Sequence, residues 1–144
     1  MFERYTEKAR RVIFFARGEA SVYGSNQITA EHLLLGLFRD PNPLWNKLGD
    51  IGSADVFRTK MGPEAPPEEQ IPTNKEIPLS PEAEQALRLA VEEAELRKQR
   101  EIGTKHLLAG LLRIGDCRAV QILRDSGVDL ERMVEIARKT EAKD

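Results

Sequence analysis

The sequence predicts an all-α protein built from two copies of one helical repeat, with about four helices in each copy and eight in all. Two observations predict this fold. The segment 28–39 returns as the segment 102–113, which indicates an internal duplication. Apolar residues recur at helical spacing in both copies, and nothing alternates with the period of two that a half-buried strand requires.

The duplication keeps a constant offset of 74 positions, which pairs His32 with His106. The same offset pairs further residues without a gap: Ala9 with Ala83, Ala16 with Ala90, Glu19 with Glu93, and Ala20 with Ala94. Chance supplies single alanine or leucine matches, but it does not easily supply His, Gly and Arg in one register. We therefore expect two repeats related by a pseudo-twofold axis.

The sequence predicts a series of helices in the first repeat, residues 1–61. Thr6 is the expected N-cap of the first helix. A helical apolar stripe follows it: Ala9, Val12, Ile13, Ala16 and Ala20. The alanines are small enough to let a second helix, starting at Thr29, approach closely. Shorter helices are expected around 45–48 and 54–61.

Residues 62–78 are rich in proline and acidic residues and are expected to form an extended linker outside the core. The second repeat, residues 79–144, opens with Ser80 as N-cap and Pro81 at the first helical position. Glu82 and Glu84 place negative charge where the helix dipole favours it. Later helices are expected from near Gly103, around 119–123 and over 129–139.

Composition excludes several classes of function. Hydrophobic residues make up 40% and charged residues 32%, with a net charge of −2, so no basic surface for nucleic acid is implied. No apolar run has the length of a membrane span, and the N-terminus has no signal-peptide core. Cys117 is the lone cysteine, so an internal disulfide is excluded and a cytoplasmic, reducing location is predicted.

The segment 1–9, together with two (E/K)-H-L-L-x-G-L motifs at 31–37 and 105–111, resembles the double Clp N-terminal domain. The resemblance is closest to the ClpC/ClpA-type AAA+ unfoldases and extends from Phe2 to about Lys139. It implies an all-α, pseudo-twofold fold that receives substrates and adaptor proteins ahead of ATPase modules. Some relatives of this kind carry the repeat alone.

The expected function is a non-catalytic protein-binding domain of the Clp system. Its partners would be protein substrates, adaptor proteins, or Clp unfoldase or protease subunits, with no nucleic acid, membrane or cofactor. The chain has no Gly-x-x-x-x-Gly-Lys-Ser/Thr loop, so it holds no Walker-type phosphate cradle and is not expected to be an enzyme. The alternative is a stand-alone regulatory or structural protein that docks on a Clp protease complex. Residues 40–43 and Trp45 depart from the family pattern and favour a stand-alone or specialised protein.

Two residue types invite a catalytic or metal interpretation, and neither is expected to have that role. His32 and His106 are equivalent and fall at the third position of their helices, where a capping role is favoured over a metal site. A zinc site normally needs three or four ligands with characteristic spacing, and the sequence shows no such cluster. Cys117 has no nearby histidine in sequence and is expected to be a packing residue.

Glu31 and Thr29 form the first candidate binding site, expected beside Arg10 and Arg11. In ClpC-type domains the glutamate of each Gly-Thr-Glu-His motif is implicated in binding phosphorylated arginine, so the resemblance implies that role for Glu31. A carboxylate suits a guanidinium, and helix-start N–H groups suit a phosphate. The first repeat has Ala30 in place of the family threonine, and the second has Lys105 in place of the glutamate, so at most one such site is expected.

Phe2 and Tyr5 form the second candidate, an apolar patch near the twofold, since the resemblance implies partner binding around this segment. The alternative is that Phe2 fastens the first helix to the core. Arg10 is the remaining candidate. It belongs to a charged run with Lys8, Arg11 and Arg17 that is also typical of a solvated helix face.

Overall fold

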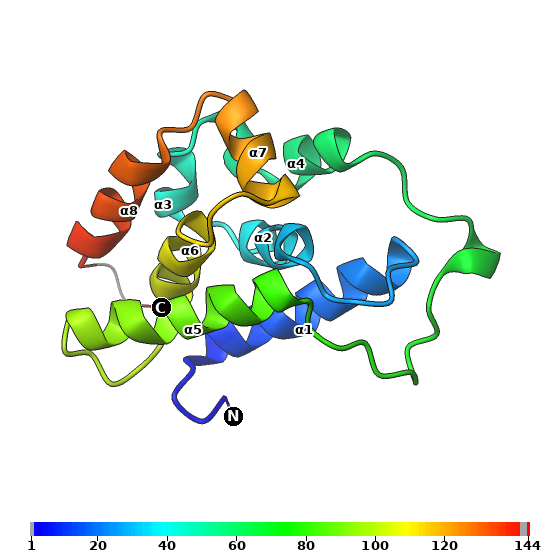
Figure 1. The fold of residues 1–144 in the computed structure, drawn as a ribbon, viewed down its shortest axis with the longest axis horizontal. Coiled ribbons are helices and arrows are strands. Elements are labelled where there is room, and N and C mark those ends of the chain that lie inside the picture. Colours follow the sequence, from blue (N-terminus) through cyan, green and yellow to red (C-terminus); the bar gives the residue numbers. More distant parts are fainter. Residues whose placement is uncertain (1, 142–143) are drawn as a thin grey trace.

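The computed structural model describes residues 2–141 and 144, and in this part of the chain it is all-α, as predicted. Eight α-helices are described: α1 (Glu7–Val22), α2 (Ala30–Arg39), α3 (Pro43–Asn46), α4 (Ala54–Met61), α5 (Pro81–Leu96), α6 (Thr104–Leu112), α7 (Arg118–Asp125) and α8 (Leu130–Lys139). Two 3₁₀ turns, Asp50–Gly52 and Pro67–Glu69, complete the regular structure (Figure 1). In the described residues, extended pairing is limited to two isolated bridges.

The long first helix of each repeat starts at the predicted cap. The Thr6 hydroxyl oxygen accepts the Ala9 N–H at 3.1 Å, and the Ser80 hydroxyl oxygen accepts the Ala83 N–H at 3.1 Å. Pro81 occupies the first turn of α5, where a missing N–H costs nothing. The short helix α3 begins at Pro43, before the predicted start at Trp45, because the Asn42 side chain caps it by accepting the Leu44 N–H at 2.9 Å.

Close crossings of α1 with α2 and of α5 with α6 form the centre of each repeat. The alanines predicted to allow this approach are buried: Ala9, Ala16 and Ala20 in α1, and Ala83, Ala90 and Ala94 in α5. Glycine completes each crossing from the other helix. A Cβ at Gly36 would lie 2.6 Å from the Val12 carbonyl oxygen, and one at Gly110 would lie 2.5 Å from that of Ala86. Gly36 and Gly110 are 74 positions apart, as are Val12 and Ala86, so the two contacts occupy equivalent positions in the two repeats.

The repeats are joined by two equivalent backbone bridges, Tyr5 with Ile102 and Ile28 with Leu79. Four hydrogen bonds build these bridges: Thr6 N to Ile102 O at 3.0 Å, Ile102 N to Arg4 O at 2.8 Å, Ser80 N to Ile28 O at 2.9 Å, and Ile28 N to Pro78 O at 2.8 Å. Each bridge ties the start of one repeat to the segment before the second helix of the other. One continuous hydrophobic core therefore runs through both repeats.

The predicted linker, residues 62–78, lies between α4 and α5 and follows the outer edge of the molecule (Figure 1). Backbone bonds from Ala65 N to Val22 O at 2.9 Å and from Ile71 N to Ser21 O at 3.0 Å hold it against the end of α1. The expectation that the whole segment lies outside the core is wrong at Ile77, which is buried. Arg17 does not simply face solvent, because its guanidinium donates to carbonyl oxygens of this segment.

Candidate functional site

His32 and His106 cap the two central helices, as the sequence predicted. Nδ1 of His32 accepts the Thr29 N–H, and Nδ1 of His106 accepts the Gly103 N–H, each at 2.9 Å. Burial lowers the pKa of His32 to about 4 and also lowers the pKa of His106, so both rings are neutral at pH 7. Within the described residues, no group of three or more His, Cys, Asp or Glu side chains is arranged to hold a metal ion.

Glu31 lies in the first turn of α2 and is 8% exposed. Burial raises the pKa of its carboxyl, while its own backbone N–H, the nearby Arg118 and the Thr29 hydroxyl act in the opposite direction. Glu82, in the first turn of α5, adds a repelling negative charge. The surroundings of Glu31 are therefore the starts of α5 and α7.

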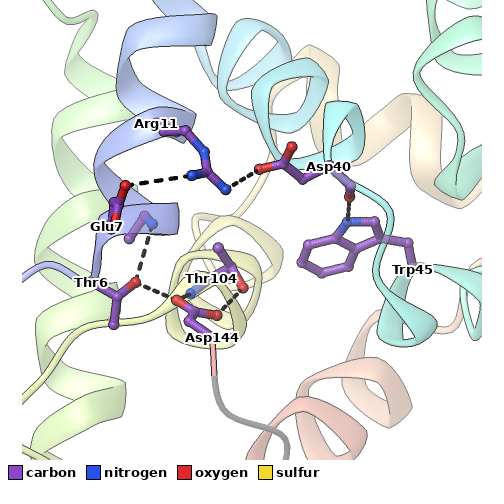
Figure 2. A network of polar contacts seen from close by, with 8 residues as sticks. Thr6, Glu7, Arg11, Asp40, Trp45, Thr104 and Asp144 are labelled. Atoms are coloured by element: carbon purple, nitrogen blue, oxygen red, sulfur yellow. Dashed lines mark hydrogen bonds and ion pairs between the residues drawn. The ribbon is translucent and has the colours of Figure 1, made fainter.

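The prediction that Glu31 lies beside Arg10 and Arg11 is wrong. Arg10 donates to the carbonyl oxygens of Phe2 at 3.2 Å and Glu3 at 3.3 Å, at the N-terminal end of the chain. Arg11 forms ion pairs with Glu7 at 3.8 Å and Asp40 at 3.2 Å (Figure 2). The error has a topological cause, because each repeat's first helix starts against the other repeat's second helix.

The candidate residues consequently form two groups, one at each inter-repeat bridge. Thr29 and Glu31 follow the Ile28–Leu79 bridge at the start of α2. Phe2, Tyr5 and Arg10 surround the Tyr5–Ile102 bridge, on the side where α6 starts. The two groups occupy pseudo-equivalent positions, but they do not make one site.

Phe2 and Tyr5 border a groove of about 630 Å³ that the sequence did not reveal in full. Tyr5 is buried, Phe2 is half-buried, and their rings meet edge to face with centroids 4.9 Å apart. Burial raises the pKa of Tyr5 to about 12. Of the predicted apolar patch, the half-buried Phe2 provides the accessible part, and the buried Tyr5 lies beside it in the lining of the groove.

The rest of the groove is lined by α5, by Leu79 before it and by Ile102 before α6. Its further apolar side chains are Leu79, Leu87, Val91 and Ile102, and charged residues complete the lining: Glu3 and Arg4 from the N-terminal segment, and Glu84 and Arg88 from α5. Sequence reasoning missed Leu87 and Val91 as site residues. A signal was present at Val91 alone, because the equivalent position in the first repeat is the charged Arg17, whereas Leu87 is equivalent to the apolar Ile13.

The fold and these bridges define a duplicated, all-α helical-repeat domain. The chain matches the family described as the Clp repeat (R) N-terminal domain over residues 4–126 and again over 78–141. It therefore belongs to the Clp N-terminal domain family. The resemblance found in the sequence is confirmed.

One relative is the ATP-dependent Clp protease ATP-binding subunit ClpA homologue from Cyanidium caldarium. It is 36% identical over 138 residues, covering 92% of this chain and 16% of the relative. The negative regulator of genetic competence ClpC/MecB from Bacillus subtilis (strain 168) is 34% identical over 136 residues, covering 92% of this chain and 16% of that protein. The chain thus spans about 16% of the length of these relatives.

Two solved structures share the fold. The N-terminal domain of the chaperone ClpD from Arabidopsis thaliana has a TM-score of 0.77 at 27% identity, covering 95% of this chain and 94% of that chain. The Hsp104 N-terminal domain from Candida albicans has a TM-score of 0.76 at 19% identity, covering 95% and 91%, and shows likeness of fold alone. In the part of the chain that the structure describes, no helix is long and apolar enough to cross a membrane.

Proposed function

We propose that this chain is a non-catalytic protein-binding domain of the Clp chaperone and protease system, which recruits protein substrates or adaptor proteins. The observation that carries the proposal is the groove between Phe2 and α5. Its walls come from both repeats, so its shape depends on the assembled domain. The lone, half-buried Cys117 supports action in a reducing compartment such as the cytoplasm.

The chemistry of the groove suits an extended peptide with an apolar anchor. Phe2, Leu79 and Val91 are half-buried, so each leaves apolar surface that a ligand side chain would remove from water. Arg4, Glu84 and Arg88 provide charges of both signs at the lining. Such a surface suits a partner with an apolar centre and a polar periphery, as protein interfaces commonly have.

Binding of fluorescently labelled casein, used as an unfolded model substrate, tests the proposal by anisotropy. Val91→Glu places a charge in the groove and is expected to weaken binding by about tenfold or more, since burying an unpaired carboxylate is costly. Leu96→Glu is the matched control, because Leu96 is on the same helix, is 60% exposed and is not part of the groove. Equal binding by both variants and the parent chain would contradict the groove as the binding site.

A second ligand chemistry is proposed at Glu31 and Thr29, where the carboxylate would receive the guanidinium of a phosphorylated arginine. The position of Glu31 at the start of a ten-residue helix supports it, because helix-start N–H groups favour a phosphate. The burial of Glu31 counts against a strong site, since the residue is 8% exposed and its carboxylate must remain charged to bind a cation. We propose this site in the first repeat only.

A further inference from the structure

Arg39 and Arg113 stand at equivalent positions of the two repeats, 74 positions apart, but they have different partners. The Arg113 guanidinium donates to Oε2 of Glu93 at 2.7 Å and to Oε1 of Glu92 at 2.9 Å. The Arg39 guanidinium instead lies over the Phe15 ring, with its central carbon 4.2 Å from the ring centroid. Among the residues that the structure describes, no carboxylate forms an ion pair with Arg39.

The sequence difference that leaves Arg39 unpaired lies on α1. Gly18 stands at the position equivalent to Glu92, so one of the two carboxylates is missing from the first repeat. Glu19 is equivalent to Glu93, but it is 4% exposed and forms its ion pair with an arginine of α4. A Cβ added at Gly18 would meet nothing within 4 Å, so the position that carries the Glu92 side chain in the second repeat is open in the first.

The Phe15 ring holds the Arg39 guanidinium in an orientation that suits a carboxylate. Stacking uses the face of the planar group and leaves the N–H donors at its edge available. A carboxylate accepts two such donors side by side, which gives the pair both strength and a defined geometry. Arg39 is exposed, so a group from another molecule can reach these donors. Because the ring already restrains the side chain, less conformational freedom is lost when that group binds.

Two neighbouring features extend the contact beyond a single charge. Arg39 borders a cavity of about 610 Å³ at the end of α2, α3 and the start of α4, whose charged lining is Arg39, Arg58 and Asp55. Two arginines and one aspartate give this lining a positive balance, which favours an acidic ligand. Phe14 is 73% exposed, and its ring centroid lies 6.1 Å from that of Phe15, so apolar surface lies next to the cation. An acidic residue with an apolar neighbour matches both features.

We propose that Arg39 is a docking site for an acidic segment of a partner protein. An Asp or Glu carboxylate of the partner takes the place that Glu92 holds beside Arg113, and an apolar side chain next to it covers Phe14. The pairing within the second repeat supports this occupant, because it shows which group this arginine position accepts when one is within reach. The site shares no residue with the groove between Phe2 and α5, so either proposal can fail without the other.

Fluorescence anisotropy with an N-terminally labelled Asp-Leu-Asp-Leu peptide, amidated at its C-terminus, tests the proposal at low salt. The same peptide with asparagine in place of aspartate is the control for charge. Arg39→Ala is expected to weaken binding of the acidic peptide by at least about tenfold, since a charge-assisted pair is lost. Val91→Glu, in the groove, is expected to leave this binding unchanged. No binding by the parent chain, equal binding by Arg39→Ala, or equal binding of the two peptides would overturn the proposal.

Gly18→Glu supplies the missing carboxylate from within the chain. It is expected to occupy Arg39 as Glu92 occupies Arg113, and so to weaken peptide binding as far as Arg39→Ala does. Gly18→Gln is the matched control, because it has the same size without the charge, and it is expected to bind like the parent chain. Both variants are expected to fold, since Gly18 is exposed and its Cβ position is open. Equally tight binding by the two variants would contradict the proposed site.

Urea unfolding separates a docking role of Arg39 from a structural one. Within the described part of the chain, Oε1 of Glu19 is buried and has no hydrogen-bond partner, so the alternative is that Arg39 turns to this oxygen in solution. Arg113→Ala removes two ion pairs and is expected to lower the unfolding midpoint clearly. Arg39→Ala is expected to leave the midpoint nearly unchanged, because the side chain is exposed and unpaired. An equal loss in both variants would refute the docking site and assign Arg39 to Glu19.

Discussion

At the scale of single residues, two buried glutamates at non-equivalent positions of the repeats have different electrostatic roles. Glu93 is buried and holds Arg113 and Arg138, with hydrogen bonds of 2.7 to 2.8 Å. Glu31 is also buried, but the pKa of its carboxyl is raised by burial, whereas the bonds from Arg138 lower the pKa of Glu93. A buried carboxylate is thus stabilising in one place and a candidate binding group in the other.

The Glu31 proposal predicts an asymmetric response to a phosphoarginine peptide in isothermal titration calorimetry. At most one site per chain is expected. Glu31→Ala should abolish binding, because a charge-assisted hydrogen bond of about 1.5–3 kcal/mol is lost. Lys105→Ala should not weaken binding, since an ammonium group repels a guanidinium. Two equal sites per chain would refute the charge argument, and no binding would leave Glu31 as a helix-start carboxylate.

Glu93→Gln is expected to lower the free energy of unfolding by about 2 kcal/mol at pH 7, because it removes the buried carboxylate that accepts from both Arg113 and Arg138. The folded-state pKa of Glu93 is below its unfolded value of about 4.5, so its stabilisation is complete above that value and is lost as the pH falls through the folded pKa. Urea unfolding at pH 7 and pH 3 should therefore show that the difference in unfolding free energy between variant and parent becomes smaller in acid.

Glu31→Gln is the control, because the pKa of Glu31 is shifted in the opposite direction. Its raised pKa means that ionisation opposes folding, so it should cost no stability at pH 7.

At the scale of elements, the close helix crossings decide where small residues are required. Gly110 in α6 and Gly36 in α2 face carbonyl oxygens of the crossing helix, whereas a Cβ added at Gly18 in α1 would meet nothing within 4 Å. All three lie in helices, where alanine is intrinsically favoured by about 1 kcal/mol. At Gly36 and Gly110, the close packing therefore outweighs the intrinsic preference of a helix for alanine. At Gly18 there is no such packing constraint.

Gly110→Ala is expected to destabilise the domain by about 2 kcal/mol, because the added methyl forces α5 and α6 apart. Gly18→Ala is expected to stabilise it by about 0.5–1 kcal/mol. Chemical denaturation followed by circular dichroism measures both. Stabilisation by Gly110→Ala would show that the crossing tolerates a wider separation than the structure has.

At the scale of the whole molecule, the reciprocal bridges make the two repeats one folding unit. Neither first helix completes its start without the other repeat, since Thr6 N bonds Ile102 O and Ser80 N bonds Ile28 O. The shared core adds apolar contacts between α2 and α6. Separate unfolding of one repeat would expose this surface and break both bridges.

The chain is therefore expected to unfold in one cooperative transition. Trp45 is the single tryptophan and its ring packs against Phe38 in the first repeat, so its fluorescence reports on the packing of that repeat. Gly110→Ala, in the second repeat, should shift the fluorescence midpoint as far as it shifts the circular dichroism midpoint. A shift in circular dichroism without a shift in Trp45 fluorescence would contradict the single unit.

The sequence by itself determined the helical class, the duplication, the caps and the family. These features depend on local chemistry and on residue spacing, as at Thr6, Ser80 and the two histidines. Only the tertiary structure decided which elements meet. The exchange of contacts between repeats separated Glu31 from Arg10, gave the Phe2 groove its α5 wall and brought Asp144 to Thr104. The physical reason is that bridges and ion pairs between distant positions depend on how the repeats pack, which no local pattern of side chains encodes.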